Sequence, residues 1–459
     1  MYKINFQKPI HIHFIGIGGI SMSGLAEILL EEGFTVSGSD AKESPLTKKL
    51  ESEGAVIHYG QCAENITDDI NCVVYTAAIN KSNPELMEAV GKKIPMLTRA
   101  ELLGQLMKNY DTPIAVSGTH GKTTTTSMIS EVLLAADMDP TISVGGILKT
   151  IGGNIRVGKS GNFITEACEY TNSFLHFYPK ISVILNIEED HLDFFKDLED
   201  IRHSFHQFSA LLPSDGTLII NGDIKDYQEI YEGLDCNVIT YGSSAEFDYS
   251  ATEIQYDEKG FVSFELLKHN TSCGRVQLSV TGDHNVSNAL AAIATAELLG
   301  IPMDTIRKGL LSFSGTDRRF EYKGTFNGVT VVDDYAHHPT EIRATLTAAK
   351  NYPHKRLVLA FQPHTYSRTK AFLDDFADVL SMADVVVLAD IYAAREKNTY
   401  GISSRDILAK LKEKGTECYY FPSFEEIEKF LLKNCINGDL LITMGAGDIV
   451  NVGEHLLGR

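Results

Sequence analysis

The stretch SGTHGKTTTT, residues 117–126, follows the apolar run Pro113–Ser117 and precedes a run that is compatible with a helix. A glycine loop in this position turns backbone N–H groups and the start of a helix towards phosphate groups, whose negative charge the helix dipole favours. Lys122 would then reach the β- and γ-phosphates, and the hydroxyl of Thr123 would bind Mg²⁺. The spacing is G-x-x-G-K-T, shorter than the usual G-x-x-x-x-G-K, because Val116 occupies the first glycine position.

This loop by itself predicts a site for nucleotide phosphates, and the alternative is a glycine turn before a threonine-rich helix. Nucleotide contacts are expected from the loop and the start of the helix, namely Gly118, Thr119, His120, Gly121, Lys122, Thr123 and Thr124.

Strand and helix signals alternate on both sides of the loop, which is typical of an α/β protein with mostly parallel sheets. A new unit starts near Asp111–Pro113, and another starts after Gly315. Between Phe247 and Val280 the apolar residues alternate instead, as in an antiparallel insert. We therefore expect three domains, each long enough for its own core. They are a Rossmann-like domain at 1–110, a P-loop ATPase-type domain with a mixed sheet at 111–315, and a C-terminal Rossmann-like domain at 316–459.

Composition narrows the function classes. The 459 residues carry a formal net charge of −20, which argues against broad binding of nucleic acid or anionic membranes but not against phosphate ligands. No apolar run approaches the ~18 residues that a membrane helix needs. The seven cysteines include no C-x-x-C pair, so a reducing cytoplasm fits best.

A second glycine loop, GIGGIS at Gly16–Ser21, resembles the G-x-G-x-x-G dinucleotide fingerprint, with Ser21 in place of the third glycine. Asp40 follows the next strand, where an acid would meet a ribose hydroxyl. An NAD-dependent dehydrogenase is an alternative for this domain taken alone, although such an enzyme has no use for the downstream ATP loop. A tight strand-to-helix turn without a ligand is a further alternative.

Acidic and histidine side chains follow predicted strands in the second unit. TEACEYTNSFL carries Glu166 and Glu169, and NIEEDHLDFF carries Asp190 and His191. Ligands of open α/β sheets bind at the carboxyl ends of the strands, so these groups could hold a second Mg²⁺ beside the nucleotide. The alternative for each segment is a solvated acidic loop.

The third unit offers two further segments directly after strands. DDYAHHPTEI, at Asp333–Ile342, puts two histidines at a helix entrance, where Pro339 suits the first helical position. FQPHTYSRT adds His364 and Arg368 after the next strand. A lone histidine is usually structural, but two such segments on adjacent strand ends favour a site.

Two other segments have both a ligand-binding and a structural interpretation. Arg318, in GTDRRFE, lies between the second and third units, where it could bridge a transferred phosphoryl group or form a hinge salt bridge. In GDHNVSNALAA, His284, Asn285 and Asn288 could bind a base or ribose. Asn285 could instead, or in addition, cap a helix.

Taken in order, these segments resemble the Mur ligase family. The matching pieces extend from Phe14 to Ile449 and are FIGIGGISMSGLAEIL, SGTHGKTTTT, EACEYTNSFL, NIEEDHLDFF, GDHNVSNALAA, GTDRRFE, DDYAHHPTEI, FQPHTYSRT and MGAGDI. Each piece alone is weak, but the ordered set is specific. The resemblance implies an N-terminal domain for a UDP-sugar, a central ATPase and a C-terminal domain for an amino acid.

Site residues follow from the resemblance position by position. It implies that Thr123, Glu166 and His191 bind metal, and that His284, Asn288, Arg318 and Asp333 contact the nucleotide. The expected substrate-binding residues are Gly16, Gly18, Gly19, Ser21, Asp40, Thr76, His337, His364 and Arg368, the last two placing alanine and the muramyl carboxylate. The expected catalytic residues are Lys122, His191, Arg318, His364 and Arg368. Some relatives carry a carbamylated lysine near the second metal, and no residue here is assigned that role.

The activity implied by the resemblance is ATP-dependent joining of L-alanine to the carboxylate of UDP-N-acetylmuramate through an acyl phosphate, with Mg²⁺. We expect a cytoplasmic monomer or weak dimer, and the net charge and hydropathy predict that it binds no nucleic acid and does not insert into membranes. The alternatives are a family member that attaches a preformed peptide or another amino acid to a UDP-muramyl substrate, and a non-catalytic nucleotide switch.

Overall fold

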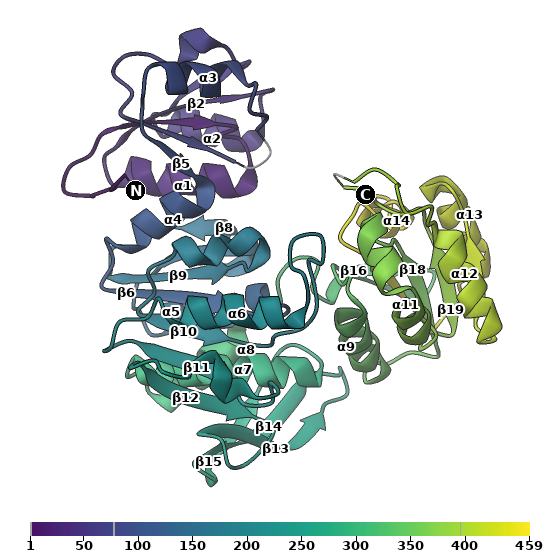
Figure 1. Ribbon diagram of the computed structural model, residues 1–459. Coiled ribbons are helices and arrows are strands. Elements are labelled where there is room, and N and C mark those ends of the chain that lie inside the picture. The colour runs from purple at the N-terminus through teal and green to yellow at the C-terminus, as the bar shows by residue number, and fades with distance from the viewer. Residues whose placement is uncertain (1, 77–78, 395) are drawn as a thin grey trace. The chain divides into compact units, whose positions relative to one another are not determined.

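The computed structural model describes residues 2–76, 79–394 and 396–459. The chain divides into two compact units. The first comprises Met1–Ile187, Ile201–Thr240 and Ala294–Ile301, and the second comprises Glu188–Asp200, Tyr241–Ile293 and Pro302–Arg459. Helices alternate with strands along most of the described chain, which confirms the predicted α/β class (Figure 1).

The first unit opens with a fully parallel sheet in the order β3-β2-β1-β4-β5. Its strands are β1 (His11–Ile15), β2 (Thr35–Asp40), β3 (Val56–Tyr59), β4 (Cys72–Tyr75) and β5 (Met96–Thr98). Its helices are α1 (Ile20–Glu31), α2 (Pro45–Ser52), η1 (Ala63–Asn65), α3 (Pro84–Gly91) and α4 (Arg99–Met107). The chain reverses its strand order between β1 and β4, and ligands of such sheets bind at this switch point.

The first unit also contains a second sheet segment in the order β11-β10-β6-β9-β7-β8, in which the pair β7–β8 is antiparallel. Its strands are β6 (Thr112–Ser117), β7 (Thr141–Leu148), β8 (Gly153–Arg156), β9 (Asn162–Ala167), β10 (Ile181–Ile184) and β11 (Thr217–Asn221). Its helices are α5 (Lys122–Ala135), η2 (Lys149–Ile151), η3 (Tyr170–His176), α6 (Leu198–Ser209) and η4 (Tyr227–Ile230). Because β6 lies between β9 and β10, the loops after these three strands meet at one edge.

The antiparallel insert predicted from the alternating pattern between Phe247 and Val280 is present, and it belongs to the second of the two compact units. It consists of β13 (Tyr249–Tyr256), β14 (Val262–Lys268) and β15 (Thr271–Gln277), which pair as a meander. Strand β12 (Asn237–Gly242) and helix α7 (Asp283–Leu298) each have residues in both units, and α8 (Met303–Ser312) follows.

The C-terminal sheet has the order β16-β17-β21-β18-β19-β20, and within it only the pair β16–β17 is antiparallel. Its strands are β16 (Glu321–Phe326), β17 (Val329–Asp334), β18 (Arg356–Phe361), β19 (Val385–Leu388), β20 (Glu417–Tyr420) and β21 (Asp439–Met444). Its helices are α9 (Pro339–Lys350), α10 (Tyr366–Ala371), α11 (Leu373–Leu380), α12 (Ser404–Glu413), α13 (Phe424–Asn434) and α14 (Val450–Leu456).

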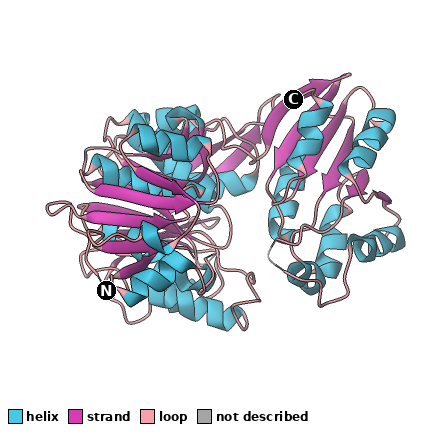
Figure 2. Cartoon of the chain, turned by 90° about the horizontal axis from the view of Figure 1, so that it is seen from above, coloured by secondary structure: helices cyan, strands magenta, loops and turns pink. Residues whose placement is uncertain are grey.

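Successive side chains of β18 point to opposite faces of this sheet, and helices cover both faces (Figure 2). Leu357, Leu359 and Phe361 pack in a cluster with α9, α11 and α12, whereas Val358 and Ala360 pack in a cluster with α13 and α14. A strand that is buried on both faces has a continuous run of apolar residues, and β18 has this pattern.

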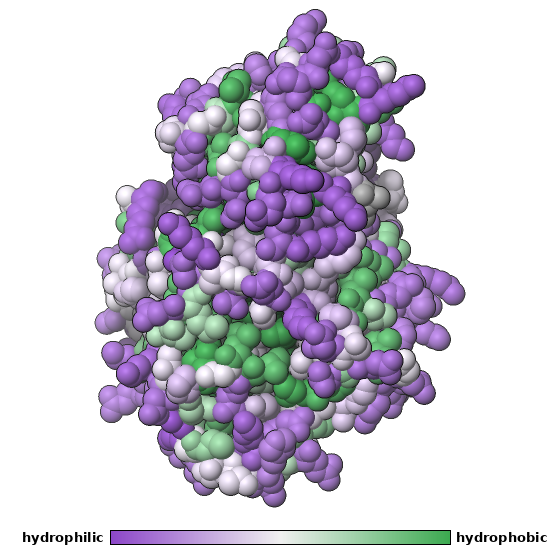
Figure 3. Space-filling model, turned by 90° about the vertical axis from the view of Figure 1, so that its left-hand side faces the viewer, coloured by the Kyte–Doolittle hydropathy of each residue, from purple (hydrophilic) through white to green (hydrophobic). Residues whose placement is uncertain are grey.

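None of the helices in the described part of the chain combines the length and hydrophobicity that crossing a bilayer requires. The face drawn in Figure 3 is mostly hydrophilic, with hydrophobic residues in patches among polar ones.

Candidate active site

The phosphate loop joins β6 to α5. Gly121 is the N-cap residue of α5 with φ +83°, and Gly118 has φ +146°. A Cβ at Gly118 would lie 2.9 Å from the Cβ of Leu185, so both conformation and space favour glycine here. Asn186, which follows β10, holds the loop from the side. Its side chain accepts from His120 N at 2.7 Å and donates to His120 O at 3.0 Å. No motif in the sequence singles out Asn186, which lies within the segment NIEEDHLDFF.

Lys122 is the first residue of α5, and its ammonium lies inside the loop. Nζ donates to the carbonyl oxygens of Gly118 and Thr119, the latter at 3.1 Å, and to Oε2 of Glu169 at 2.9 Å. The Glu169 side chain is only 2% exposed. Burial alone would lower the pKa of Lys122, but the nearby carboxylate of Glu169 outweighs burial, and the pKa is raised. Lys122 is therefore a cation at the start of a helix.

The predicted metal ligands divide between the two units. Thr123 lies in α5, and Glu166 lies at the end of β9 opposite Val116 of β6, where its carboxylate accepts from the backbone N–H of Gly145. His191 belongs to the second unit, with φ +53° and Nε2 3.8 Å from Oδ2 of Asp190.

Arg318 and Asp333, which the sequence analysis assigned separately to the nucleotide, form an ion pair with each other. Nε of Arg318 lies 3.0 Å from Oδ2 of Asp333. The two terminal nitrogens donate to Gly447 O at 3.0 Å and to Gly445 O at 2.7 Å in the MGAGDI segment. Burial raises the pKa of Asp333. This ion pair joins the segment before β16 to the end of β17, and the two hydrogen bonds join the same guanidinium to the loop after β21.

A cluster of polar side chains lies at the carboxyl ends of β17 and β18. His337 and His364 make an edge-to-face contact with ring centroids 5.4 Å apart. Arg368 donates from one terminal nitrogen to Nδ1 of His364 at 3.0 Å and from the other to Oδ1 of Asp190 at 2.8 Å. Burial alone would raise the pKa of Asp190, but the guanidinium of Arg368 outweighs it and lowers that pKa. The structure therefore brings together four residues from three segments of the sequence: Asp190, His337, and the pair His364 and Arg368.

Hydrogen bonding fixes the tautomers of both imidazoles. Because the guanidinium of Arg368 only donates, Nδ1 of His364 is an acceptor and its proton lies on Nε2. Nδ1 of His337 faces Tyr335 O at 3.0 Å and therefore carries the proton, which leaves a lone pair on Nε2. Burial lowers the pKa of each imidazole to about 4. Near neutral pH the pair thus presents one N–H donor and one acceptor.

The neutral state of His337 predicts a loss of stability in acid. Its pKa is about 4 in the folded protein and about 6.5 in the unfolded chain, so its contribution is complete above pH 6.5 and is lost as the pH falls towards 4. We expect the free energy of unfolding to fall between pH 7 and 4 by roughly 1–3 kcal/mol more in the wild type than in His337→Gln. Urea unfolding followed by circular dichroism measures this difference, and equal slopes in the two proteins would contradict it.

The first glycine loop lies at the switch point of the first sheet. The N–H of Gly18 donates to Oδ2 of Asp40 at 2.8 Å, so this carboxylate already holds the loop that it was expected to complement. Arg99, which the sequence analysis missed, donates to Oγ of Ser21 at 3.0 Å. Thr76 directly follows β4, which pairs with β1, so the predicted substrate residues of both segments share one edge.

The helix-cap interpretation of Asn285 is wrong. Helix α7 begins at Asp283, and the Asn285 amide donates to Thr281 O at 2.7 Å instead of accepting from the helix. Nδ2 of Asn288 donates to Oδ1 of Asn285 at 3.0 Å. The first turn of α7 therefore carries a buried amide pair next to His284.

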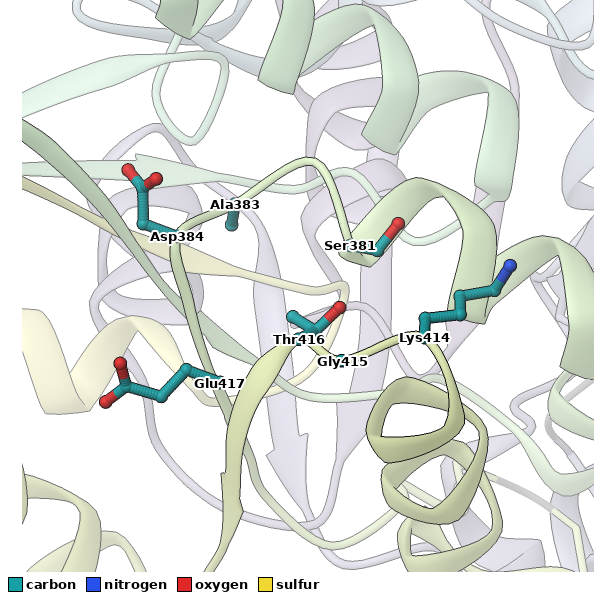
Figure 4. A pocket seen from close by; sticks show the side chains of 7 residues that line it. All are labelled: Ser381, Ala383, Asp384, Lys414, Gly415, Thr416 and Glu417. Carbon is teal, nitrogen blue, oxygen red and sulfur yellow. The ribbon is translucent and has the colours of Figure 1, made fainter.

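A surface hollow on the C-terminal sheet is unrelated to these clusters (Figure 4). It lies where β19 and β20 begin, at the sheet edge opposite His337 and His364, and its lining contains none of the predicted residues. Its lining residues are Ser381, Ala383, Asp384, Lys414, Gly415, Thr416 and Glu417.

Comparisons with known proteins cover nearly the whole chain. Family models match it in three consecutive stretches: "Mur ligase family, catalytic domain" at residues 11–111, "Mur ligase middle domain" at 116–296, and "Mur ligase, glutamate ligase domain" at 318–447. A protein of Agathobacter rectalis, named UDP-N-acetylmuramate–L-alanine ligase, is 68% identical over 457 residues and covers 100% of both chains. A protein of the same name from Lachnospira eligens is 63% identical over 458 residues, again with 100% of both chains covered.

Solved structures agree with these matches. The UDP-N-acetylmuramate-alanine ligase MurC of Thermotoga maritima aligns with a TM-score of 0.81 at 29% identity, covering 98% of this chain and 99% of that one. A murein peptide ligase of Psychrobacter arcticus aligns with a TM-score of 0.70 at 26% identity, covering 98% of each chain. The family predicted from the ordered motifs is confirmed, and this chain belongs to the Mur ligase family.

Proposed function

We propose that this chain joins L-alanine to the lactyl carboxylate of UDP-N-acetylmuramate at the expense of ATP, releasing ADP and phosphate. The observation that carries the nucleotide chemistry is the Lys122 ammonium, which lies inside the glycine loop at the start of α5. The choice of co-substrates rests on the full-length relatives that bear this activity in their names. The product would be a precursor of peptidoglycan, made in the cytoplasm by a monomer or weak dimer.

Each proposed domain has one task. Residues 1–110 would bind the UDP-sugar through Gly16, Gly18, Gly19, Ser21, Asp40 and Thr76; residues 111–315 would bind ATP; and residues 316–459 would bind alanine. In the last domain, the N–H on Nε2 of His364 suits a carboxylate, and the lone pair on Nε2 of His337 suits an amine. One donor and one acceptor side by side match the two ends of an amino acid.

The chemistry requires activation because a carboxylate has no adequate leaving group. The lactyl carboxylate attacks the γ-phosphorus, an O–P bond forms, ADP leaves, and an acyl phosphate results. The alanine amine then attacks the acyl carbon, the C–O bond breaks, and phosphate departs while the amine loses a proton. Lys122 offsets the repulsion between the two anions of the first step. Acyl phosphates hydrolyse, so the site must exclude water.

Mg²⁺ would supply further charge neutralisation at the phosphates. The hydroxyl of Thr123 and the carboxylate of Glu166 are hard oxygen donors that suit this ion. Both come from segments at neighbouring strand ends, because β6 pairs with β9. His191 stays a predicted ligand, although imidazole is less typical of Mg²⁺ than of softer metals. Arg318, Asp333, His284 and Asn288 stay predicted nucleotide contacts.

Phosphate release from ATP tests the proposal. We expect release only when UDP-N-acetylmuramate and an amino acid are both present, with alanine preferred over glycine and serine. A methyl group is worth ~1–3 kcal/mol in a fitted pocket, which sets the scale of that preference. Release that needs L-alanyl-γ-D-glutamyl-meso-diaminopimelate in place of alanine would favour the peptide-attaching alternative. Nucleotide binding without any amide product would favour the alternative of a non-catalytic nucleotide switch.

A further inference from the structure

Glu169 is placed by a turn that is conformationally costly. Glu169 follows β9. Thr171 and Asn172, two and three residues further along, have φ values of +55° and +56°. Residues other than glycine rarely adopt this left-handed backbone conformation, and a β-branched threonine there is strained. The N–H of Asn172 donates to the carbonyl of Glu169 at 2.9 Å and closes the turn. Strain of this kind persists only where surrounding contacts impose it.

Those contacts come from α6. Phe174, fully buried, stacks on Phe208 with ring centroids 4.6 Å apart and meets Phe205 edge-to-face at 5.4 Å. The hydroxyl of Ser204 donates to the side-chain oxygen of Asn172. The turn is thus anchored to α6, which fixes the backbone position from which the Glu169 side chain reaches Lys122.

The carboxylate occupies one of the positions around Lys122 that a phosphate would need. An ammonium has three N–H donors, and Nζ already faces three acceptor groups: the carbonyls of Gly118 and Thr119 and the carboxylate of Glu169. A phosphate oxygen can reach Nζ only by displacing one of them. The two carbonyls belong to the loop itself, whereas Glu169 is the one anion among the three.

We propose that Glu169 is a positioning residue that keeps the Lys122 ammonium inside the nucleotide-free loop and is displaced from it by the nucleotide phosphates. The proposal rests on the nucleotide site of the proposed function and adds a cost to binding there. Glu169 competes with phosphate for the same cation, and its carboxylate, 2% exposed, would lose its ion pair with Lys122 on displacement. A divalent cation arriving with the nucleotide would offset the loss of that ion pair.

Two consequences distinguish this role from a merely structural one. Removing the carboxylate charge is expected to tighten nucleotide binding, whereas damage to the loop would weaken it. The gain should also be larger for the nucleotide without metal than for its Mg²⁺ complex, because metal-free phosphates bring no positive charge that offsets the lost ion pair between Glu169 and Lys122.

Isothermal calorimetry of ATP on the full chain, in EDTA and then in Mg²⁺, tests both consequences. Glu169→Gln is expected to lower the Kd of metal-free ATP by about tenfold, the scale of one charged hydrogen bond, and to lower that of Mg-ATP less. In steady-state assays, the KM of Glu169→Gln for ATP should fall because phosphate no longer competes with a carboxylate for Lys122. Its kcat should also fall because the Lys122 ammonium is no longer held in position. Glu169→Asp keeps a carboxylate on a shorter side chain, so its Kd for metal-free ATP should lie between those of the wild type and Glu169→Gln. It provides the test if Glu169→Gln does not fold. Glu232→Gln, on an exposed position of the same unit, is the matched control.

Unchanged or weaker binding of metal-free ATP by Glu169→Gln would overturn the proposal while leaving the proposed function intact. Failure of the wild type to bind ATP at all would overturn both.

Discussion

Lys122→Ala is expected to lower kcat/KM by about a thousandfold or more, because one preorganised donor in such a site contributes 10²–10³-fold and Lys122 also carries a full charge. The ammonium lies at the start of α5, where it offsets the approach of a carboxylate to a triphosphate. Phosphate release with both co-substrates present measures the loss. Lys225→Ala, which removes an exposed lysine of the same unit, is the control and should keep wild-type turnover.

The same variant should remain folded but be less stable, because the buried Glu169 carboxylate loses its ion pair with the Lys122 ammonium. Adding Glu169→Gln to Lys122→Ala is expected to restore stability and not turnover. This double variant separates the structural from the chemical contribution of Lys122. Full activity in either variant would refute the phosphate role.

Arg368→Ala is expected to destabilise the second unit by about 3–5 kcal/mol and to abolish most activity. Arg368 and Asp190 are each 9% exposed and lie 2.8 Å apart, so truncation leaves a buried carboxylate uncompensated. Nε of Arg368 is buried without a hydrogen-bond partner among the described residues, which leaves one donor for a substrate carboxylate. Urea unfolding by circular dichroism measures the stability, since the chain contains no tryptophan for fluorescence.

The companion variant is Arg368→Ala with Asp190→Asn. Neutralising the orphaned carboxylate should recover part of the lost stability, whereas turnover should stay low because the guanidinium is still missing. Arg368→Lys keeps the charge but not the planar fork, so it should fall short of wild-type activity as well. Wild-type stability in Arg368→Ala would show that the ion pair contributes nothing to the fold.

Much of the fold could be predicted because its signals are local. A glycine loop between an apolar strand and a helix is visible at Ser117–Thr126, and alternation between Phe247 and Val280 marks the meander. The ordered motifs predicted the family, and the family models confirm it. Positions at strand ends were also predictable, since carboxyl ends of parallel strands meet at one edge.

Which side chains contact one another in the site depends on the order of the strands in the sheet. Local sequence patterns do not reveal that order. Glu169 reaches Lys122 and Asn186 reaches His120 because β6 lies between β9 and β10, although these segments are tens of residues apart in sequence. Asn285 was misread because both a cap and an interior first-turn amide suit asparagine before an apolar run.

Isotope transfer tests the central claim, activation of a carboxylate by the nucleotide held in this loop, most directly. UDP-N-acetylmuramate labelled with ¹⁸O in both carboxylate oxygens is incubated with ATP, Mg²⁺, alanine and the protein, and the released phosphate is analysed by mass. The account predicts one ¹⁸O atom in each phosphate, because the acyl C–O bond breaks when the amine attacks. Amide product accompanied by unlabelled phosphate would contradict it.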